Sequence, residues 1–382
     1  MTILLLTHSY PDEVNKWRGS FIRDQAEAIS AHHKVIVVYF RSDNSRFSPF
    51  AKYTFTRNVN GNIEVYSVVS SRSFPVINQV KYLNDSYRFI RDEIAARENI
   101  DIIHSHLSYP AGFLGVFAGK LLKVPVVITE HSWLTNHFRS FIHKECVLYA
   151  VRKADSVITV SNALKENITS YCKRPVEVIP NVVDTCKFHI VPRIKNDEVN
   201  IGLLGGMGTR IKGTDVLLNA VALINDPGLK VHIGGAGKYL DEYKELAKNL
   251  GIDEKVTFYG EITSDKKSDF YSKLDIYVMA SHRETFGVVI VEALASGLPV
   301  IATKCGGPEE IVNSSNGVLT ERNDPQALAD AIINISGRLQ EFDKLKIRAN
   351  AIALYGTESF VSRLNSVYLD LTNKITESAP GL

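Results

Sequence analysis

The chain has 382 residues, a formal net charge of +2 at pH 7, 45% hydrophobic and 23% charged residues. That length suffices for two domains, and the composition is typical of a globular protein rather than a disordered one. The four cysteines show no CxxC spacing, which argues against a zinc site or a disulfide framework and favours a reducing cytoplasm. The opening apolar run, 2–7, is too short for a signal peptide, and no apolar stretch reaches membrane-spanning length.

The charge is unevenly divided along the chain. Residues 1–190 carry 23 Lys and Arg against 17 Asp and Glu, and residues 191–382 carry 21 against 25, so that balances of +6 and −4 give the net +2. A basic first half indicates contact with an anionic membrane surface or lipid phosphate, with ordinary surface scatter as the alternative. No compact basic run with interleaved aromatics occurs, which argues against nucleic acid as a partner.

Short β-rich apolar runs alternate with helical patterns in the first half, as in βαβ units. Helices are expected at Ile22–Ala31 and Val80–Arg97. The expected strands are Ile3–Thr7, Val35–Tyr39, Ile63–Val68, Ile102–His104, Val126–Thr129, Ser156–Val160 and Val176–Ile179.

The second half repeats this alternation, so the sequence predicts an α/β fold with two Rossmann-like domains, residues 1–188 and 189–358. The boundary is expected within Asp184–Asn196, a polar stretch without periodicity, and an amphipathic helix is expected at Ser359–Asn373. The expected strands are Asn200–Leu204, Lys230–Gly234, Val256–Tyr259, Ile276–Met279, Pro299–Ala302 and Gly317–Leu319.

Two carboxylates, Glu284 and Glu292, flank the predicted start of a helix near Gly287, directly after a strand. The unpaired N–H groups at Phe286 to Val288 would face the carboxyl edge of the sheet, where anions bind. Glu292 lies in an apolar segment, where an ionised side chain is costly without a partner, and ribose hydroxyls can be that partner. The alternative is that both side chains simply lie on a solvated face, as two glutamates at this spacing usually do. The arrangement favours a nucleotide-sugar site.

The stretch from Ser281 to Thr303, followed by Gly306-Gly-Pro-Glu-Glu-Ile-Val312, resembles the signature of the retaining GT-B glycosyltransferases of family four. Weaker matches cover nearly the whole chain. The resemblance implies two Rossmann-like domains facing each other across a cleft, with the last helix, about 359–382, packing back on the first domain. It also implies a nucleotide-sugar substrate, with UDP as the expected nucleotide.

The resemblance extends to a glycine-rich loop, 201–213, in which Lys212 resembles the family's donor-diphosphate lysine. Arg210 lies in the same loop. The family has an arginine just after the first glycine at the strand end, where this chain has Gly206, so Arg210 is a candidate to supply that charge. The glycines at 234–237 and 260 resemble the walls for the nucleobase, although ordinary turns would look the same.

In the first half, Gly19, within Trp17-Arg-Gly-Ser-Phe-Ile-Arg23, resembles the family's glycine near the diphosphate. His131, in Thr129-Glu-His-Ser132, resembles the family's cleft histidine and would orient the sugar as a neutral hydrogen-bond partner. His106 is either an acceptor contact or a packed histidine. No metal-ligand spacing emerges among the histidines.

No Asp-x-Asp occurs in the chain, which argues for diphosphate stabilisation without a metal or cofactor. The sequence therefore predicts a retaining glycosyltransferase in which Glu284, His131 and Lys212 act on the sugar and diphosphate, and Glu292 holds the ribose. The expected acceptor is a glycan or lipid-linked glycan of polysaccharide synthesis at the cytoplasmic membrane. The alternatives are a nucleotide-sugar epimerase or hydrolase on the same fold, or a non-catalytic nucleotide-sugar-binding protein.

A basic and apolar segment of the first half bears on the membrane hypothesis. It contains Arg139, Lys144, Arg152 and Lys153 beside Phe138, Phe141, Ile142, Val147, Leu148 and Val151. Such a face can lie on an anionic membrane, or it can simply pack inward.

Overall fold

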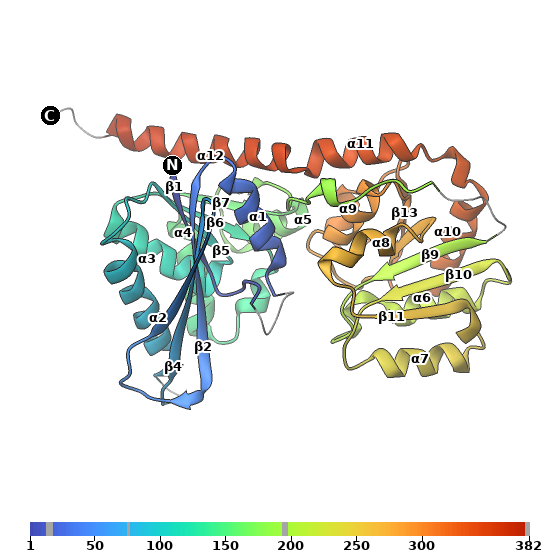
Figure 1. The fold of residues 1–382 in the computed structure, drawn as a ribbon, viewed down its shortest axis with the longest axis horizontal. Coiled ribbons are helices and arrows are strands. Elements are labelled where there is room, and N and C mark those ends of the chain that lie inside the picture. Colours follow the sequence, from blue (N-terminus) through green and yellow to red (C-terminus); the bar gives the residue numbers. More distant parts are fainter. Residues whose placement is uncertain (13–17, 75–76, 193–197, 379–382) are drawn as a thin grey trace. The chain divides into compact units, whose positions relative to one another are not determined.

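The computed structural model describes residues 1–12, 18–74, 77–192 and 198–378 (Figure 1). The chain forms two compact units, one of Met1–Val182 with Glu358–Leu382 and the other of Val183–Thr357. The predicted boundary after residue 188 thus falls six residues beyond the division after Val182. The reason lies in hydrogen bonds: the Val183 amide donates to the Tyr355 carbonyl at 3.0 Å, and Arg348 donates to the Thr185 carbonyl at 3.3 Å. These bonds tie the start of the linker to the second unit.

The first unit is built on an eight-stranded sheet in the order β3-β4-β2-β1-β5-β6-β7-β8, parallel except for the β3–β4 pair. Its strands are β1 Thr2–Thr7, β2 Lys34–Phe47, β3 Thr54–Asn60, β4 Ile63–Arg72, β5 Ile102–His106, β6 Val126–Glu130, β7 Ser156–Thr159 and β8 Glu177–Val178. Its helices are α1 Ser20–Ser30, α2 Asn78–Phe89, α3 Phe113–Leu122, α4 Phe141–Lys153, α5 Asn162–Tyr171 and α12 Thr357–Ser378.

Side chains alternate between the two faces of this sheet, and both faces are buried. Leu4 and Leu6 of β1 pack into a core shared with α2, α3 and α4. Ile3 and Leu5 pack on the opposite face, where α1 and the C-terminal α12 cover the strands. The α12 residues in that core are Phe360, Val361, Leu364, Val367 and Tyr368.

The second unit contains a six-stranded, all-parallel sheet in the order β11-β10-β9-β12-β13-β14. Its strands are β9 Val199–Leu204, β10 Leu229–Gly234, β11 Val256–Gly260, β12 Ile276–Met279, β13 Val300–Thr303 and β14 Gly317–Thr320. Its helices are α6 Thr214–Ala222, α7 Leu240–Asn249, α8 Lys267–Tyr271, α9 Val288–Ala295, α10 Pro325–Gly337 and α11 Lys344–Tyr355.

Every strand segment predicted from the sequence overlaps an observed strand, and β12 matches residue for residue. Both units are Rossmann-like, and in both the strand order reverses beside the first strand. The reversal lies between β1 and β5 in the first unit and between β9 and β12 in the second. Ligands of such sheets bind beyond the carboxyl ends of the strands at this reversal, which directs attention to the loops after these four strands.

Candidate functional site

In the second unit, Lys212 and Glu284 meet at the carboxyl ends of β9 and β12. The Lys212 Nζ donates to Glu284 Oε2 at 2.7 Å, across 72 residues of sequence. Their side chains are 29% and 15% exposed, so the pair is open enough to meet a ligand and buried enough to be screened only partly. The two residues that the sequence predicted for the sugar and diphosphate are therefore brought together.

The loop that carries Lys212 is held by close backbone packing. Gly213 has a φ of 65°, and a Cβ there would lie 1.9 Å from the Ala280 carbonyl oxygen, so only glycine fits. The His282 amide donates to the Ile211 carbonyl at 2.8 Å. These contacts fix the loop after β9 to the segment after β12.

Glu284 is positioned from both sides by the loop after β13. Its amide donates to the Cys305 carbonyl at 3.0 Å, and its carbonyl accepts from the Gly307 amide at 3.0 Å. Its side-chain Oε1 accepts from the Thr285 amide at 3.0 Å. A carboxylate oxygen retains lone pairs after these bonds, so Glu284 can also accept hydroxyl groups of a bound sugar.

Helix α9 begins directly after this segment, as predicted. Gly287 is its N-cap, with a φ of 104°, and Phe286 before it is buried. A Cβ on Gly307 would lie 2.4 Å from the Phe286 Cα, so the loop after β13 presses on the helix start. The first-turn N–H groups of a helix have no partner inside it, and together with the helix dipole they favour an anion at this end.

Glu292 is buried, at 5% exposure, but its charge is compensated within the protein. Lys267 donates to its Oε1 at 2.5 Å, and the Tyr271 hydroxyl donates to its Oε2 at 2.8 Å. The partner that its burial requires is therefore present on α8, and ribose hydroxyls are not needed to offset the burial. The ribose contact itself stays a prediction. The sequence offered no signal for this pairing, since Lys267 and Tyr271 precede Glu292 by 25 and 21 residues.

Arg210 is exposed, and its guanidinium contacts side chains outside its own loop. It donates to Glu242 of α7 and lies over the Tyr239 ring, with 4.9 Å to the ring centroid. Its Nη1 is 4.0 Å from Asp215 Oδ2. The predicted phosphate contact of Arg210 stays a prediction, and it would compete with Glu242 for the guanidinium. At Gly206 a Cβ would meet nothing within 4 Å, so that position is spacious in this chain.

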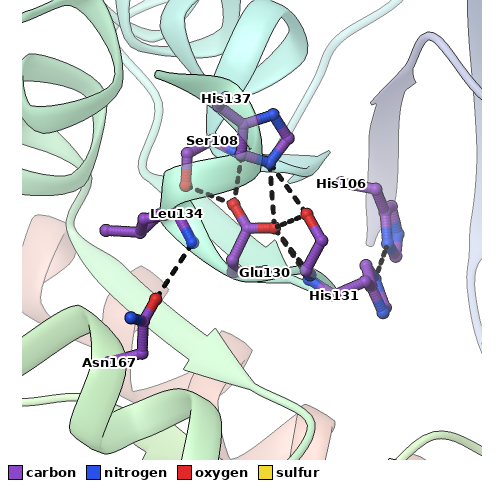
Figure 2. A network of polar contacts seen from close by, with 8 residues as sticks. His106, Ser108, Glu130, His131, Leu134, His137 and Asn167 are labelled. Atoms are coloured by element: carbon purple, nitrogen blue, oxygen red, sulfur yellow. Dashed lines mark hydrogen bonds and ion pairs between the residues drawn. The ribbon is translucent and has the colours of Figure 1, made fainter. Parts of the chain in front are cut away.

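In the first unit, the strongest polar cluster centres on Glu130, at the end of β6 (Figure 2). Its Oε2 accepts from the Ser108 amide at 2.8 Å and hydroxyl at 2.6 Å, and its Oε1 accepts from the His131 and Ser132 amides. Burial alone would raise the pKa of Glu130, but His137 and the Ser108 bonds outweigh it and lower the pKa to about 2. The buried carboxylate thus fixes the backbone at His131. The sequence analysis had not singled it out.

His131 belongs to a column of buried histidines. Its Nε2 lies 2.9 Å from His106 Nδ1, and the His106 ring stacks on His104 with centroids 4.6 Å apart. The other end is closed by Tyr368 of α12, whose hydroxyl is 2.6 Å from His104 Nδ1. Burial lowers the pKa of His104 to about 3 and that of His131 to about 4. His131 is therefore neutral and can either donate to or accept from a hydroxyl, and His106 is a packed histidine within the column.

Gly19 is the N-cap of α1, with a φ of 69°, and a Cβ there would lie 2.2 Å from the Ser9 carbonyl oxygen. This close approach explains the glycine, and its predicted proximity to a diphosphate stays a prediction. Trp17, from the same motif, lies outside the described residues. Among residues 1–12, 18–74, 77–192 and 198–378, no group of three His, Cys, Asp or Glu side chains is placed to hold a metal ion.

The first unit also has a cavity of about 1000 Å³ that the sequence analysis did not predict. Its walls come from the loops after β1, β5 and β6, from the middle of β2, from β3 and β4, and from the first halves of α2 and α4, which lie apart in the sequence. The polar residues among them include His8, Arg18, Arg41, Asn78, His137, Arg139 and His143. It lies at the carboxyl edge of the sheet, beside the reversal between β1 and β5.

Comparison with known proteins agrees with this architecture. Residues 19–187 match the family described as Glycosyltransferase Family 4, and residues 187–344 match Glycosyl transferases group 1. The chain belongs to this family of glycosyltransferases, and its fold is GT-B. It is 28% identical over 284 residues to an uncharacterized glycosyltransferase of Methanocaldococcus jannaschii, covering 74% of this chain and 77% of that protein.

Two further proteins are similar. The alpha-monoglucosyldiacylglycerol synthase of Streptococcus pneumoniae is 32% identical over 235 residues, covering 55% of this chain and 53% of that protein. The Anabaena protein HepE, solved in complex with UDP, superimposes with a TM-score of 0.74 at 20% identity, covering 97% of this chain and 100% of that one. At that identity the structural likeness shows the fold alone.

Proposed function

We propose that this glycosyltransferase moves a sugar from a UDP-sugar to a glycan or lipid-linked glycan acceptor, with retention at the anomeric carbon and without a metal ion. The observation that carries the donor part is the Lys212–Glu284 pair, at 2.7 Å, beside the start of α9. A cation, a helix N-terminus and a hydroxyl-accepting carboxylate converge there at the strand-order reversal. UDP as the nucleotide is supported by the complex of the structurally similar Anabaena protein.

Each group of the second unit then has a role in the transfer. The Lys212 ammonium and the amides at Phe286 to Val288 hold the diphosphate, Glu284 accepts sugar hydroxyls, and Glu292 accepts ribose hydroxyls. The acceptor oxygen bonds to the anomeric carbon, the bond from that carbon to the diphosphate oxygen breaks, and the acceptor proton passes to the departing diphosphate oxygen. Negative charge grows on the diphosphate as that bond breaks, so fixed positive groups stabilise the transition state more than the ground state.

His131 belongs to the other unit, and its contact with the sugar is part of this proposal. The rigid setting supports such a role, because Glu130 holds the His131 backbone and His106 holds its Nε2. A neutral imidazole whose Nε2 is engaged by His106 has its other nitrogen, Nδ1, for a hydrogen bond to a hydroxyl.

A lipid-linked acceptor is supported by the name of the Streptococcus pneumoniae relative, a diacylglycerol glycosyltransferase. None of the described helices is both long enough and apolar enough to cross a bilayer. We therefore propose that the protein meets its acceptor as a peripheral protein at the inner face of the cell membrane, as in envelope polysaccharide assembly.

The donor assignment is tested by mass spectrometry of UDP-sugars incubated with the protein, first without acceptor, as slow hydrolysis. Lys212→Ala is expected to lower turnover about a hundredfold or more, the scale of losing one preorganised charge-stabilising group. Glu284→Gln is expected to lower it as well, whereas Lys248→Ala, an exposed lysine on α7, should leave it unchanged. Wild-type turnover in a Lys212→Ala protein that is folded would refute the assignment.

Metal independence and retention of configuration can each be tested by a separate experiment. Activity should survive excess EDTA, since lysine and helix amides replace a metal in neutralising the diphosphate. Complete loss on chelation, restored by manganese, would refute metal independence. Retention is read by NMR of the anomeric proton in the product, and inversion of the donor's configuration would refute it.

A further inference from the structure

The cavity of the first unit is lined by more cationic than anionic groups. Three arginines, Arg18, Arg41 and Arg139, face two aspartates, Asp12 and Asp43, which leaves a formal balance of +3 − 2 = +1. Burial alone would lower the pKa of His137, but its hydrogen bond to Glu130 raises it above the ordinary value. The lining therefore has a positive formal balance, and the raised pKa of His137 favours its charged form.

The two aspartates are already committed to partners within the protein. Asp12 Oδ2 accepts from the Arg41 Nη1 at 2.9 Å. Asp43 Oδ1 accepts from the Ser45 amide at 2.9 Å and the Ser45 hydroxyl at 2.6 Å. Arg139 is exposed on the loop between β6 and α4, so its guanidinium stands at the cavity without an ion pair among the described residues.

His8, after β1, lines the cavity together with Arg18, His137 and Arg139. Burial, together with the charges of His137, Arg18 and Arg139 and against that of Glu130, lowers the pKa of His8 to about 4. Arg18 Nη2 also donates to the His8 carbonyl at 3.1 Å. Within the described part of the chain, His8 Nδ1 is buried without a hydrogen-bond partner. His8 is therefore a neutral imidazole with an unpaired nitrogen and cationic neighbours. Such a ring suits a ligand that carries a hydroxyl close to an anionic group.

We propose that this cavity binds the acceptor through a phosphate group, held by Arg139 and Arg18 with His137, and that His8 contacts a hydroxyl of the same molecule. This inference rests on the proposed function, because it names the acceptor class of that reaction. A phosphate monoester carries −1.5 to −2 at neutral pH, which matches the positive balance of the lining. Arginine presents planar, paired donors that fit phosphate oxygens.

The aromatic residues of the cavity fit the same acceptor. Tyr39, Phe40, Tyr82 and Tyr109 form the apolar part of its lining. They give the non-ionic part of an acceptor an apolar surface, while the arginines hold its charge. The phosphate can belong to a soluble sugar phosphate or to a lipid, and the chemistry of the cavity is common to both.

The test is calorimetric titration of glycerol 3-phosphate into the full chain already saturated with UDP, which blocks the phosphate contacts of Lys212 and α9. Binding to the wild type is expected, with affinity about tenfold or more weaker for Arg139→Gln, the scale of a lost hydrogen bond to a charged group. Arg18→Gln should weaken it similarly. Arg363→Gln is the matched control, an exposed arginine on α12 that does not line the cavity.

A second experiment distinguishes an acceptor whose phosphate belongs to a lipid from one whose phosphate is soluble. Sedimentation with vesicles of phosphatidic acid in phosphatidylcholine, against phosphatidylcholine alone, should show binding that Arg139→Gln weakens if the acceptor is a lipid. If only glycerol 3-phosphate binds in an Arg139-dependent way, the acceptor is a soluble phosphate. Normal UDP binding with no Arg139-dependent phosphate binding in either arm would overturn this inference and leave the glycosyltransferase assignment standing. Failure to bind UDP would instead overturn the proposed function.

Discussion

Glu292 joins a structural role to a proposed ligand role, and the two can be separated. It is bonded to Lys267 and Tyr271, so Glu292→Gln should destabilise the protein without ligand by leaving the Lys267 charge, 20% exposed, without its partner. If it also binds ribose, UDP affinity should fall by roughly 1–3 kcal/mol. Calorimetry with UDP and thermal unfolding measure the two effects.

Lys267→Met is the matched control for that experiment. It breaks the same ion pair and should lower stability too, but it leaves the carboxylate available to ribose. Equal losses of UDP affinity in both variants would show that Glu292 acts only through its packing, and unchanged affinity in Glu292→Gln would remove it from the site.

The histidine column predicts that the first unit is labile to acid. The pKa of His104 is lowered to about 3, that of His131 to about 4, and that of His106 is lowered as well, in each case mainly by burial. The unfolded chain binds protons at these histidines from about pH 6.5 downward while the folded unit does not, so stability falls as the pH drops from 6.5 to 4. Each histidine contributes up to about 1.4 kcal/mol per pH unit in that window.

Urea unfolding followed by tryptophan fluorescence measures this, because Trp133 belongs to the first unit and residues 183–357 contain no tryptophan. His104→Gln should flatten the dependence on pH between 6.5 and 4, whereas His32→Gln, an exposed histidine, should not. Glu130, with its pKa lowered to about 2, adds a separate loss only below about pH 4.5. A stability independent of pH from 7 to 4.5 would contradict the neutral, buried state of the column.

At the scale of single elements, α4 is the part most open to a membrane role. Phe141 and Ile142, at its start, are 77% and 72% exposed, and Arg152 and Lys153 at its end are exposed as well. Val147, Leu148 and Val151, grouped with them in the sequence analysis, pack into the core instead. The exposed apolar side chains of α4 that the sequence grouped together therefore lie in its first turn, and the cations Arg152 and Lys153 lie at its other end.

We expect this surface to bind anionic vesicles weakly and reversibly. A basic residue near an anionic bilayer contributes about 1 kcal/mol, which salt screens. The double substitution Phe141→Ser with Ile142→Ser should reduce sedimentation with phosphatidylglycerol vesicles at low salt, while Ile333→Ser, a 54% exposed residue of α10, should not. Equal binding to anionic and neutral vesicles, or none to either, would favour a soluble acceptor.

The strands were predictable because parallel strands covered on both faces read as continuous apolar runs. β3 was not, since all seven of its residues are exposed and give no alternation. Lys212 and Glu284 were each indicated by the family motif, but their contact was not. Glu130 was not indicated, because its role depends on Ser108, 22 residues earlier. The cavity could not be predicted either, since it gathers residues that follow several different strands. Contacts between distant segments are what a single sequence leaves undetermined.

At the scale of the whole molecule, the last helix, α12, belongs to the core of the first unit, so the stability of that unit depends on it. Leu364 and Tyr368 of α12 are 2% and 0% exposed, in the core that also holds Ile3 and Leu5 of β1. Tyr368 in addition closes the histidine column at His104. The C-terminal segment therefore stabilises the unit in which the chain begins, and the second unit, Val183–Thr357, is an insertion within it.

Leu364→Ala tests this dependence. Removing a buried leucine side chain should cost the first unit roughly 2–5 kcal/mol, seen as a lower urea midpoint by tryptophan fluorescence. Leu369→Ala, five residues along the same helix and 50% exposed, should cost less than about 0.5 kcal/mol. UDP affinity should be unchanged in both variants under native conditions, because Lys212, the first-turn amides of α9 and Glu292, which are proposed to hold UDP, belong to the second unit. Equal stability losses in the two variants would mean that α12 does not pack on the first unit in solution, and loss of UDP binding in Leu364→Ala alone would mean that the two units fold as one.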